Sequence, residues 1–178
     1  MKVSVFCSAC EGLDRQFQEA AWGLAEGLAR AGHVIVYGGT NMGLMGIVAE
    51  AARSVGGDVV GVVPRILKME GGRRVYPDLT ELVWCNNLSD RKDIMVERSD
   101  AIIALPGGIG TLDEVFTVAA ANTIGFHSKR VILYDVDNFW QPMMDLLEAL
   151  QQRGMIRGHY SDFFVRVSSL EELMPLLQ

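Results

Sequence analysis

Short apolar runs alternate with longer amphipathic stretches along almost the whole chain. Short runs rich in Val and Ile are typical of strands buried on both faces of a parallel sheet, and the stretches between them have the length of helices. In the stretch 14–31, apolar residues return at three- and four-residue steps, which gives a helix one face to pack on a sheet. The alternation therefore predicts an α/β fold of the Rossmann-like, doubly wound type, with a mostly parallel sheet of about seven strands and helices on both faces.

The limits of the expected elements follow from the same pattern. Strands are expected at Val3–Ser8, Val34–Tyr37, Val59–Val63, Leu82–Cys85, Ala101–Leu105, Val131–Tyr134 and Phe163–Val167. Helices are expected at Asp14–Ala31, Gly43–Val55, Asp90–Ser99, Thr111–Thr123, Asn138–Arg153 and Ser169–Leu177. No repeat, linker or low-complexity tract interrupts this order, so we expect a single domain over residues 1–178.

One long irregular connection lies at 64–78 and carries the basic residues Arg65, Lys68, Arg73 and Arg74. Such a segment either covers an anionic ligand or is a solvated loop, and the solvated loop is favoured.

Charge and hydropathy exclude several classes of partner. The net charge is −6 and the basic residues are scattered, so no basic stripe for nucleic acid is present. No apolar run reaches the roughly 18 residues of a membrane span, and the first run is too short for a signal peptide. We therefore expect a cytoplasmic protein with no membrane or nucleic-acid partner. His33, His127 and His159 lie far apart without metal-ligand spacing, so no metal site is expected.

Cys7 and Cys10 stand in a Cys-x-x-Cys arrangement at the end of the first expected strand. This spacing suits a redox pair at a helix N-terminus, where the thiol pKa is lowered. Here Glu11 and Asp14 follow and make the local field acidic, which favours buried or incidental thiols.

The segment 105–114 joins an apolar strand to a helix through a glycine turn that contains Gly107, Gly108 and Gly110. A helix N-terminus presents unpaired backbone N–H groups and a partial positive charge, and glycines let an anion approach them. The turn therefore predicts a phosphate site. Glu114 follows Thr111 by three residues, and it is either the partner of Thr111 in a capping box or an acid beside the phosphate.

A second glycine cluster at 38–46 also joins a strand to a helix. Its spacing matches neither a Walker A loop nor a dinucleotide fingerprint. In a doubly wound sheet both turns converge at the carboxyl ends of the strands, where ligands bind. Arg91 is expected in the first turn of a helix capped by Ser89 or Asp90. A cation there opposes the helix dipole, so Arg91 is either an exposed arginine or one that faces an anion.

These motifs resemble those of the Lonely Guy (LOG) type phosphoribohydrolases, long mislabelled as lysine decarboxylases, and the resemblance covers nearly the whole chain. It implies hydrolysis of the N-glycosidic bond of a nucleoside 5′-monophosphate, of the AMP or N6-substituted AMP type, to a free base and ribose 5-phosphate. It also implies a homodimer and no cofactor. Arg91 and Glu114 become the catalytic pair, and the substrate-binding residues are Gly39, Gly43, Lys92, Gly107, Gly108, Gly110 and Thr111.

The sequence departs from the family pattern on the base side of the expected pocket. The departures are Thr40, Ile66, the pair Leu88-Ser89 and the pair Ala120-Ala121. They spare the phosphate cradle and the catalytic pair, so the preferred base, cytokinin precursors included, stays open. A non-catalytic carrier of a nucleotide or of molybdenum cofactor would need the glycine cradle but not Glu114 with Arg91, and the enzyme is therefore favoured.

Overall fold

The computed structural model describes residues 1–69, 71 and 74–177. Over these residues seven strands form one sheet in the order β4-β3-β2-β1-β5-β6-β7, and every neighbouring pair is parallel. The strands are β1 (Lys2–Phe6), β2 (Val34–Tyr37), β3 (Val59–Pro64), β4 (Glu81–Cys85), β5 (Ala101–Ala104), β6 (Val131–Tyr134) and β7 (Phe164–Val167). The expected α/β, doubly wound architecture is confirmed, and each strand lies within two residues of its predicted limits.

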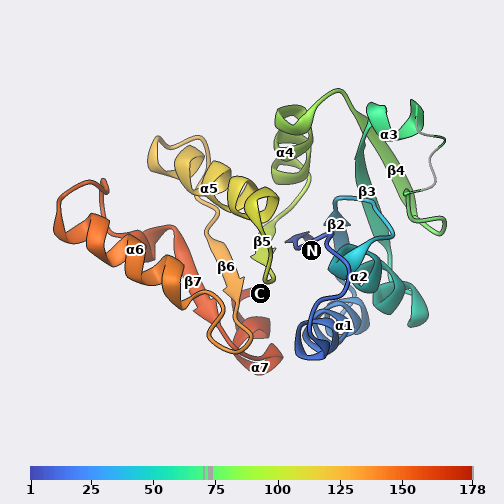
Figure 1. Ribbon diagram of the computed structural model, residues 1–178, viewed down its shortest axis with the longest axis horizontal. Helices are drawn as coiled ribbons and strands as arrows, with labels where there is room; N and C mark the ends of the chain where they lie inside the picture. The colour runs from blue at the N-terminus through green and yellow to red at the C-terminus, as the bar shows by residue number, and fades with distance from the viewer. Residues whose placement is uncertain (70, 72–73, 178) are drawn as a thin grey trace.

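Helices cover both faces of the sheet (Figure 1). One face carries α1 (Arg15–Arg30), α2 (Gly43–Ser54) and α7 (Leu170–Leu173), which is followed by a 3-10 turn at Met174–Leu177. The other face carries α4 (Leu88–Glu97), α5 (Ile109–Thr123) and α6 (Gln141–Gln152). A short α3 (Arg65–Met69) follows β3, and a 3-10 turn at Tyr160–Asp162 precedes β7.

The apolar residues form two cores, one on each side of the sheet. Successive strand residues point to opposite faces. Thus Val5 and Ile35 pack in the core beneath α1 and α2, whereas Phe6 and Val36 pack in the core beneath α4, α5 and α6. The central strands are therefore buried on both faces, as their unbroken apolar runs predict.

Two helices begin earlier than the sequence pattern predicts. For α4 the N-cap is Asn87, whose side chain accepts a hydrogen bond from the backbone N–H of Asp90, so neither Ser89 nor Asp90 is the cap. Asn caps a helix as well as Ser or Asp does, and the sequence offered all three. For α5 the N-cap is Gly108, with no side-chain hydrogen bond.

The connection 64–78 is less irregular than expected. It contains α3 and an antiparallel bridge between Thr40 and Val75, and the Tyr76 N–H donates to the Gly39 carbonyl at 2.9 Å. These bonds tie its second half to the turn after β2. Of its four basic residues, Arg73 and the side chain of Lys68 lie outside the described residues.

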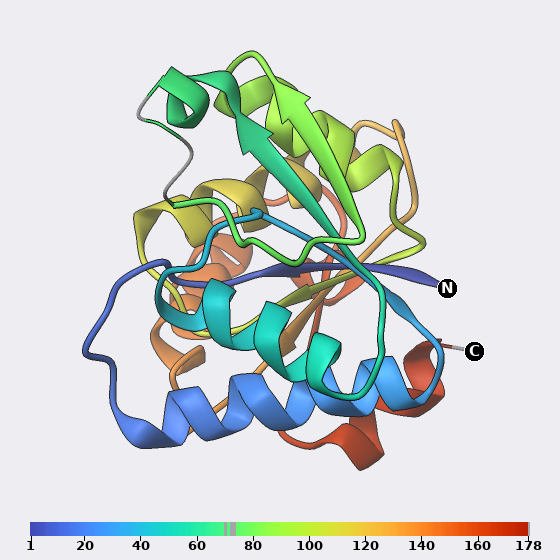
Figure 2. The ribbon, with the colours of Figure 1, turned by 90° about the vertical axis from the view of Figure 1, so that its right-hand side faces the viewer.

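The strand order reverses at β1, which has β2 on one side and β5 on the other. In open α/β sheets this is where ligands bind, at the carboxyl ends of the strands. Figure 2 shows the arrowheads of β3 and β4 pointing away from the N-terminus, so the carboxyl edge lies on the opposite side of the molecule. None of the helices described here is long and apolar enough to cross a bilayer.

Candidate active site

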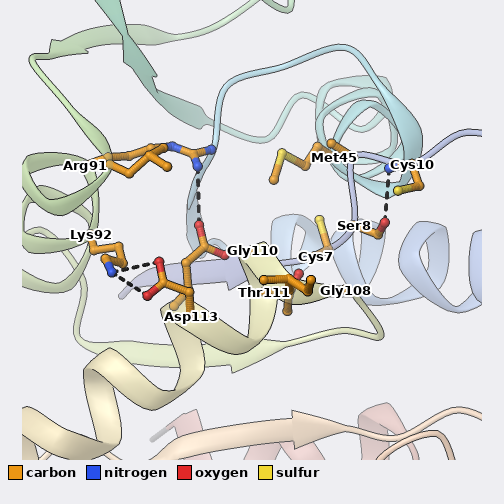
Figure 3. Close-up of a pocket in the computed structure, with 14 residues that line it drawn as sticks. Cys7, Ser8, Cys10, Met45, Arg91, Lys92, Gly108, Gly110, Thr111 and Asp113 are labelled. Carbon is orange, nitrogen blue, oxygen red and sulfur yellow. Dashed lines mark hydrogen bonds and ion pairs between the residues drawn. The ribbon is translucent and has the colours of Figure 1, made fainter.

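A cavity of about 320 Å³ opens at the carboxyl ends of β1 and β5. Its walls come from the segment 7–10 after β1, from Met45 on α2, from the first turns of α4 and from residues 108–114 of α5. Figure 3 shows Arg91, Lys92 and Asp113 on one side, Met45, Ser8 and Cys10 on the other, and Cys7, Gly108 and Thr111 between them. The fold thus brings together four segments that are far apart in the sequence.

The N-terminus of α5 forms an open wall of this cavity. Gly108 has an extended backbone, and its carbonyl accepts the hydrogen bond of the Leu112 N–H at 3.0 Å. The N–H groups before Leu112, in the first turn of α5, have no acceptor within the helix. A side chain added at Gly108 or Gly110 would meet no atom within 4 Å, so the space over these donors is empty of protein. This wall suits an anionic group.

Glu114 lies in the second turn of α5, and its side chain is only 6% exposed. Burial raises the pKa of this carboxyl to about 7; the Arg91 charge opposes the shift, Asp113 adds to it and Lys92 opposes it. The alternative of a capping box between Glu114 and Thr111 is wrong, because the helix begins at Ile109 with Gly108 as its N-cap. The geometry leaves Glu114 as a buried acid that titrates near neutral pH.

Arg91 approaches Glu114 from α4. Its guanidinium Nη1 lies 3.4 Å from the Glu114 carboxylate Oε1, a contact drawn as a dashed line from Arg91 in Figure 3. Its Nε donates to the Val62 carbonyl of β3 at 3.0 Å, and its side chain is 12% exposed. The alternative of a solvated arginine is therefore wrong. Arg91 stands in the fourth helical position, facing inward, and its charge meets a buried anion.

A second ion pair lies beside the first. The Lys92 Nζ is 2.7 Å from both carboxylate oxygens of Asp113, with Lys92 14% and Asp113 50% exposed (Figure 3). Consecutive basic residues on α4 thus face consecutive acids on α5. Asp113 was not among the predicted site residues, although its place directly before Glu114 on the helix was a signal for it.

The predicted glycines fall into two groups. Gly108 and Gly110 line the cavity together with Thr111, whereas Gly39, Gly43 and Gly107 do not. An added side chain at Gly39 would overlap Val63, one at Gly43 would overlap the Cys10 carbonyl, and one at Gly107 would overlap Thr111. The last three glycines therefore allow close packing within the protein.

Cys7 and Cys10 both line the cavity as free thiols. Cys7 is fully buried, and burial raises the pKa of its thiol far above the ordinary value. Because a redox cysteine needs a lowered pKa, Cys7 is a buried structural thiol. Ser8 and Met45 also face the cavity, and neither was a predicted site residue, although Met45 lies within the glycine cluster 38–46. Among the residues the structure describes, no cluster of three His, Cys, Asp or Glu is placed to hold a metal ion.

Comparison with known proteins finds both a family model and similar sequences. A family model described as "Possible lysine decarboxylase" matches residues 45–177. A probable cytokinin riboside 5′-monophosphate phosphoribohydrolase of Oryza sativa subsp. japonica is 37% identical over 183 aligned positions, covering 98% of this chain and 79% of that protein. A cytokinin riboside 5′-monophosphate phosphoribohydrolase of Rhodococcoides fascians is 37% identical over 154 positions, covering 86% of this chain and 77% of that protein.

Solved structures share the fold at lower identity. The molybdenum cofactor binding protein of Rippkaea orientalis matches with a TM-score of 0.73 at 23% identity, covering 99% of this chain and 94% of that one. A molybdenum cofactor carrier protein of Chlamydomonas reinhardtii matches with a TM-score of 0.71 at 16% identity, with coverage of 99% and 94%. At these identities the likeness concerns the fold alone.

Proposed function

Since the chain belongs to the Lonely Guy (LOG) family, we propose that it hydrolyses the N-glycosidic bond of a nucleoside 5′-monophosphate, of the AMP or N6-substituted AMP type, to a free base and ribose 5-phosphate. Two relatives that are 37% identical over most of both chains support this proposal, because both are named as phosphoribohydrolases of cytokinin riboside 5′-monophosphates, one of them as probable. The observation that carries the proposal is the buried Glu114, which Arg91 holds in the cavity. The open N-terminus of α5 forms part of the wall of the same cavity.

In this proposal the 5′-phosphate binds the backbone donors at 108–111, with Thr111 beside them. Helix N-termini bind phosphate through unpaired N–H groups and a favourable dipole. Binding the phosphate supplies energy that orients the ribose at the reacting bond. Lys92 borders the same cavity and adds positive charge, which its pair with Asp113 partly balances.

Glu114 then acts at the ribose. Cleavage of an N-glycosidic bond passes through an oxocarbenium-like sugar, which a fixed carboxylate stabilises while it orients or deprotonates the attacking water. A pKa of about 7 places Glu114 where a general base works efficiently at neutral pH. Arg91 is already bound to Val62 and Glu114, so we assign it to holding this carboxylate.

The name of the matching family model suggests a second chemistry, which the site does not fit. A lysine decarboxylase would hold pyridoxal phosphate on a lysine amine, and that amine must lose its proton to react. Among the described residues that line the cavity, Lys92 supplies the lysine amine, and that amine is already engaged by Asp113, with its Nζ 2.7 Å from both carboxylate oxygens.

A carrier function is the second candidate, because the chain shares its fold with proteins named molybdenum cofactor carriers. A carrier has no use for a buried carboxylate that costs free energy to ionise. The pairing of Glu114 with Arg91 therefore favours hydrolysis.

The test is release of free base from a panel of purine, pyrimidine and N6-substituted nucleoside monophosphates. Glu114→Gln keeps the shape of the side chain and removes its charge, so we expect base release to fall by about 1,000-fold or more while nucleotide binding is kept. Glu50→Gln, at an exposed position of α2, is the matched control and keeps full activity. Tight AMP binding with no base released from any nucleotide would support the carrier instead.

We also propose a cytoplasmic, single-domain homodimer. Large apolar side chains are exposed on the rim of the cavity and on the neighbouring helices, as a partner surface requires. They include Leu88 at 61%, Ile109 at 87% and Leu146 at 53% exposure. Light scattering after gel filtration tests the dimer, and a monomeric mass at micromolar concentration would contradict it.

A further inference from the structure

We propose that Gly38 is a positioning residue: its missing side chain leaves the seat in which the Arg91 guanidinium lies when it holds Glu114. The inference rests on the proposed hydrolysis and deepens it, because it assigns a residue that acts on Glu114 through the position of Arg91. Gly38 comes directly after β2, two strands away from β5 in the sheet.

Space, and not backbone conformation, makes glycine necessary at this position. Gly38 is absent from the glycines with positive φ, so its backbone conformation is open to any residue. An added Cβ would overlap the Arg91 Nη2 and would lie 2.9 Å from both the Arg91 Cζ and the Met45 Sδ. Real Cβ atoms essentially never come so close to their neighbours.

Arg91 has no free direction in which to yield while keeping its contacts. Its Nε donates to the Val62 carbonyl of β3 at 3.0 Å, and its Nη1 reaches Glu114 on α5 at 3.4 Å. The third side of the guanidinium lies against Gly38. A methyl group at Gly38 would therefore push the guanidinium away from Glu114. Because the displaced atoms end a long side chain, the fold survives and the pairing is lost.

Gly38 differs in this respect from the glycines of the α5 turn. An added side chain at Gly108 or Gly110 meets no protein atom within 4 Å, so it would obstruct only a ligand. Substitution at Gly38 is thus expected to affect turnover, and substitution at Gly110 to affect phosphate binding. These two outcomes distinguish a glycine that makes room for a protein side chain from one that makes room for a ligand.

The experiment compares Gly38→Ala with Arg91→Ala and with the double variant. A misplaced catalytic group costs about 100-fold in rate, so we expect kcat of Gly38→Ala to fall by about 100-fold while ribose 5-phosphate binding stays within about threefold. In the Arg91→Ala background Gly38→Ala should have no further effect on kcat. Gly23→Ala, on α1 with open space around it, is the control and leaves kcat unchanged.

A second readout does not depend on the reaction. The charged and titratable groups acting on the Glu114 carboxyl are Arg91 and Lys92 on α4, Asp113 on α5 and Cys7 after β1. Carbon-13 NMR follows its titration, whose wild-type midpoint is expected near pH 7. Because Arg91 lowers this pKa, Gly38→Ala and Arg91→Ala should raise the midpoint equally, and the double variant should match them.

Two results would contradict the proposal that Gly38 seats Arg91. One is a wild-type titration and wild-type kcat in Gly38→Ala. The other is a loss of stability in Gly38→Ala that persists in the Arg91→Ala background, because Gly38 would then act through the backbone or Met45. If no nucleotide is hydrolysed by the wild type, the proposed function fails, and the titration still decides whether Gly38 seats Arg91.

Discussion

The two glycine turns occupy equivalent places in the fold, yet the first is filled by protein and the second is open at Gly108 and Gly110, although Thr111 fills the space at Gly107. The turn after β2 has its glycine spaces occupied by protein, with Gly39 against Val63 and Gly43 against the Cys10 carbonyl. The turn after β5 has empty space at Gly108 and Gly110, over the N-terminus of α5. The comparison teaches that a glycine cluster between a strand and a helix serves close packing in one turn and ligand access in the other.

The largest effect on stability is expected at the filled turn, from Gly43→Ala. Gly43 has a φ of +52° and its missing side chain leaves room for the Ala9 and Cys10 backbone. Strain and overlap together should lower the free energy of unfolding by about 3 kcal/mol. Urea denaturation measures this loss. An unchanged midpoint would show that the turn has room to spare, and the comparison would fail.

The next effect concerns the acid beside the open turn. Burial raises the pKa of Glu114 from 4.5 to about 7, so between these values the folded protein keeps a proton that the unfolded chain has released. The free energy of unfolding therefore falls as the pH rises through this window, by about 3 kcal/mol at most.

Glu114→Gln removes the titrating group and should flatten this pH dependence in urea unfolding at pH 4.5 to 8. Glu50→Gln should keep the wild-type slope, since Glu50 is exposed. If wild type and Glu114→Gln show the same slope, Glu114 ionises as freely as an exposed carboxyl.

A smaller effect is expected at the open turn itself. Gly110→Ala adds a methyl group where no protein atom lies within 4 Å. It should change the free energy of unfolding by less than about 1 kcal/mol, because Ala is favoured over Gly within a helix. It should weaken binding of ribose 5-phosphate by about tenfold, since the methyl group enters the space above the backbone donors. Calorimetry measures both, and unchanged phosphate affinity would place the phosphate elsewhere.

The smallest effect is expected from the exposed edge of the site, with Asp113→Asn. Asp113 is half exposed in its pair with Lys92, and pairs with a solvent-exposed partner contribute about 1 kcal/mol or less. Losing the Asp113 charge should lower the Glu114 pKa, because that charge raises it. The pH profile of kcat/KM should therefore shift to lower pH. A shift to higher pH would contradict the assigned direction.

Much of the fold could be predicted because its cause is local. Buried strands such as β2 and β6 are unbroken apolar runs, and the structure places both at the predicted residues. Helix starts were less predictable, since Asn87, Ser89 and Asp90 are all good caps and the choice depends on which side chain reaches a free N–H. The short α3 was missed because it holds only five residues.

The features of the candidate site likewise divide into those that the sequence predicts and those that it does not. Periodicity and residue type suffice to predict the order of the βαβ units, the position of both glycine turns and the presence of an acid and an arginine near them. Three features are visible only in the folded molecule: which glycines are filled, that Glu114 is buried, and that Arg91 lies between β2, β3 and α5. They could not be predicted because clearance and desolvation at a residue depend on atoms from distant segments, which come together only when the sheet forms.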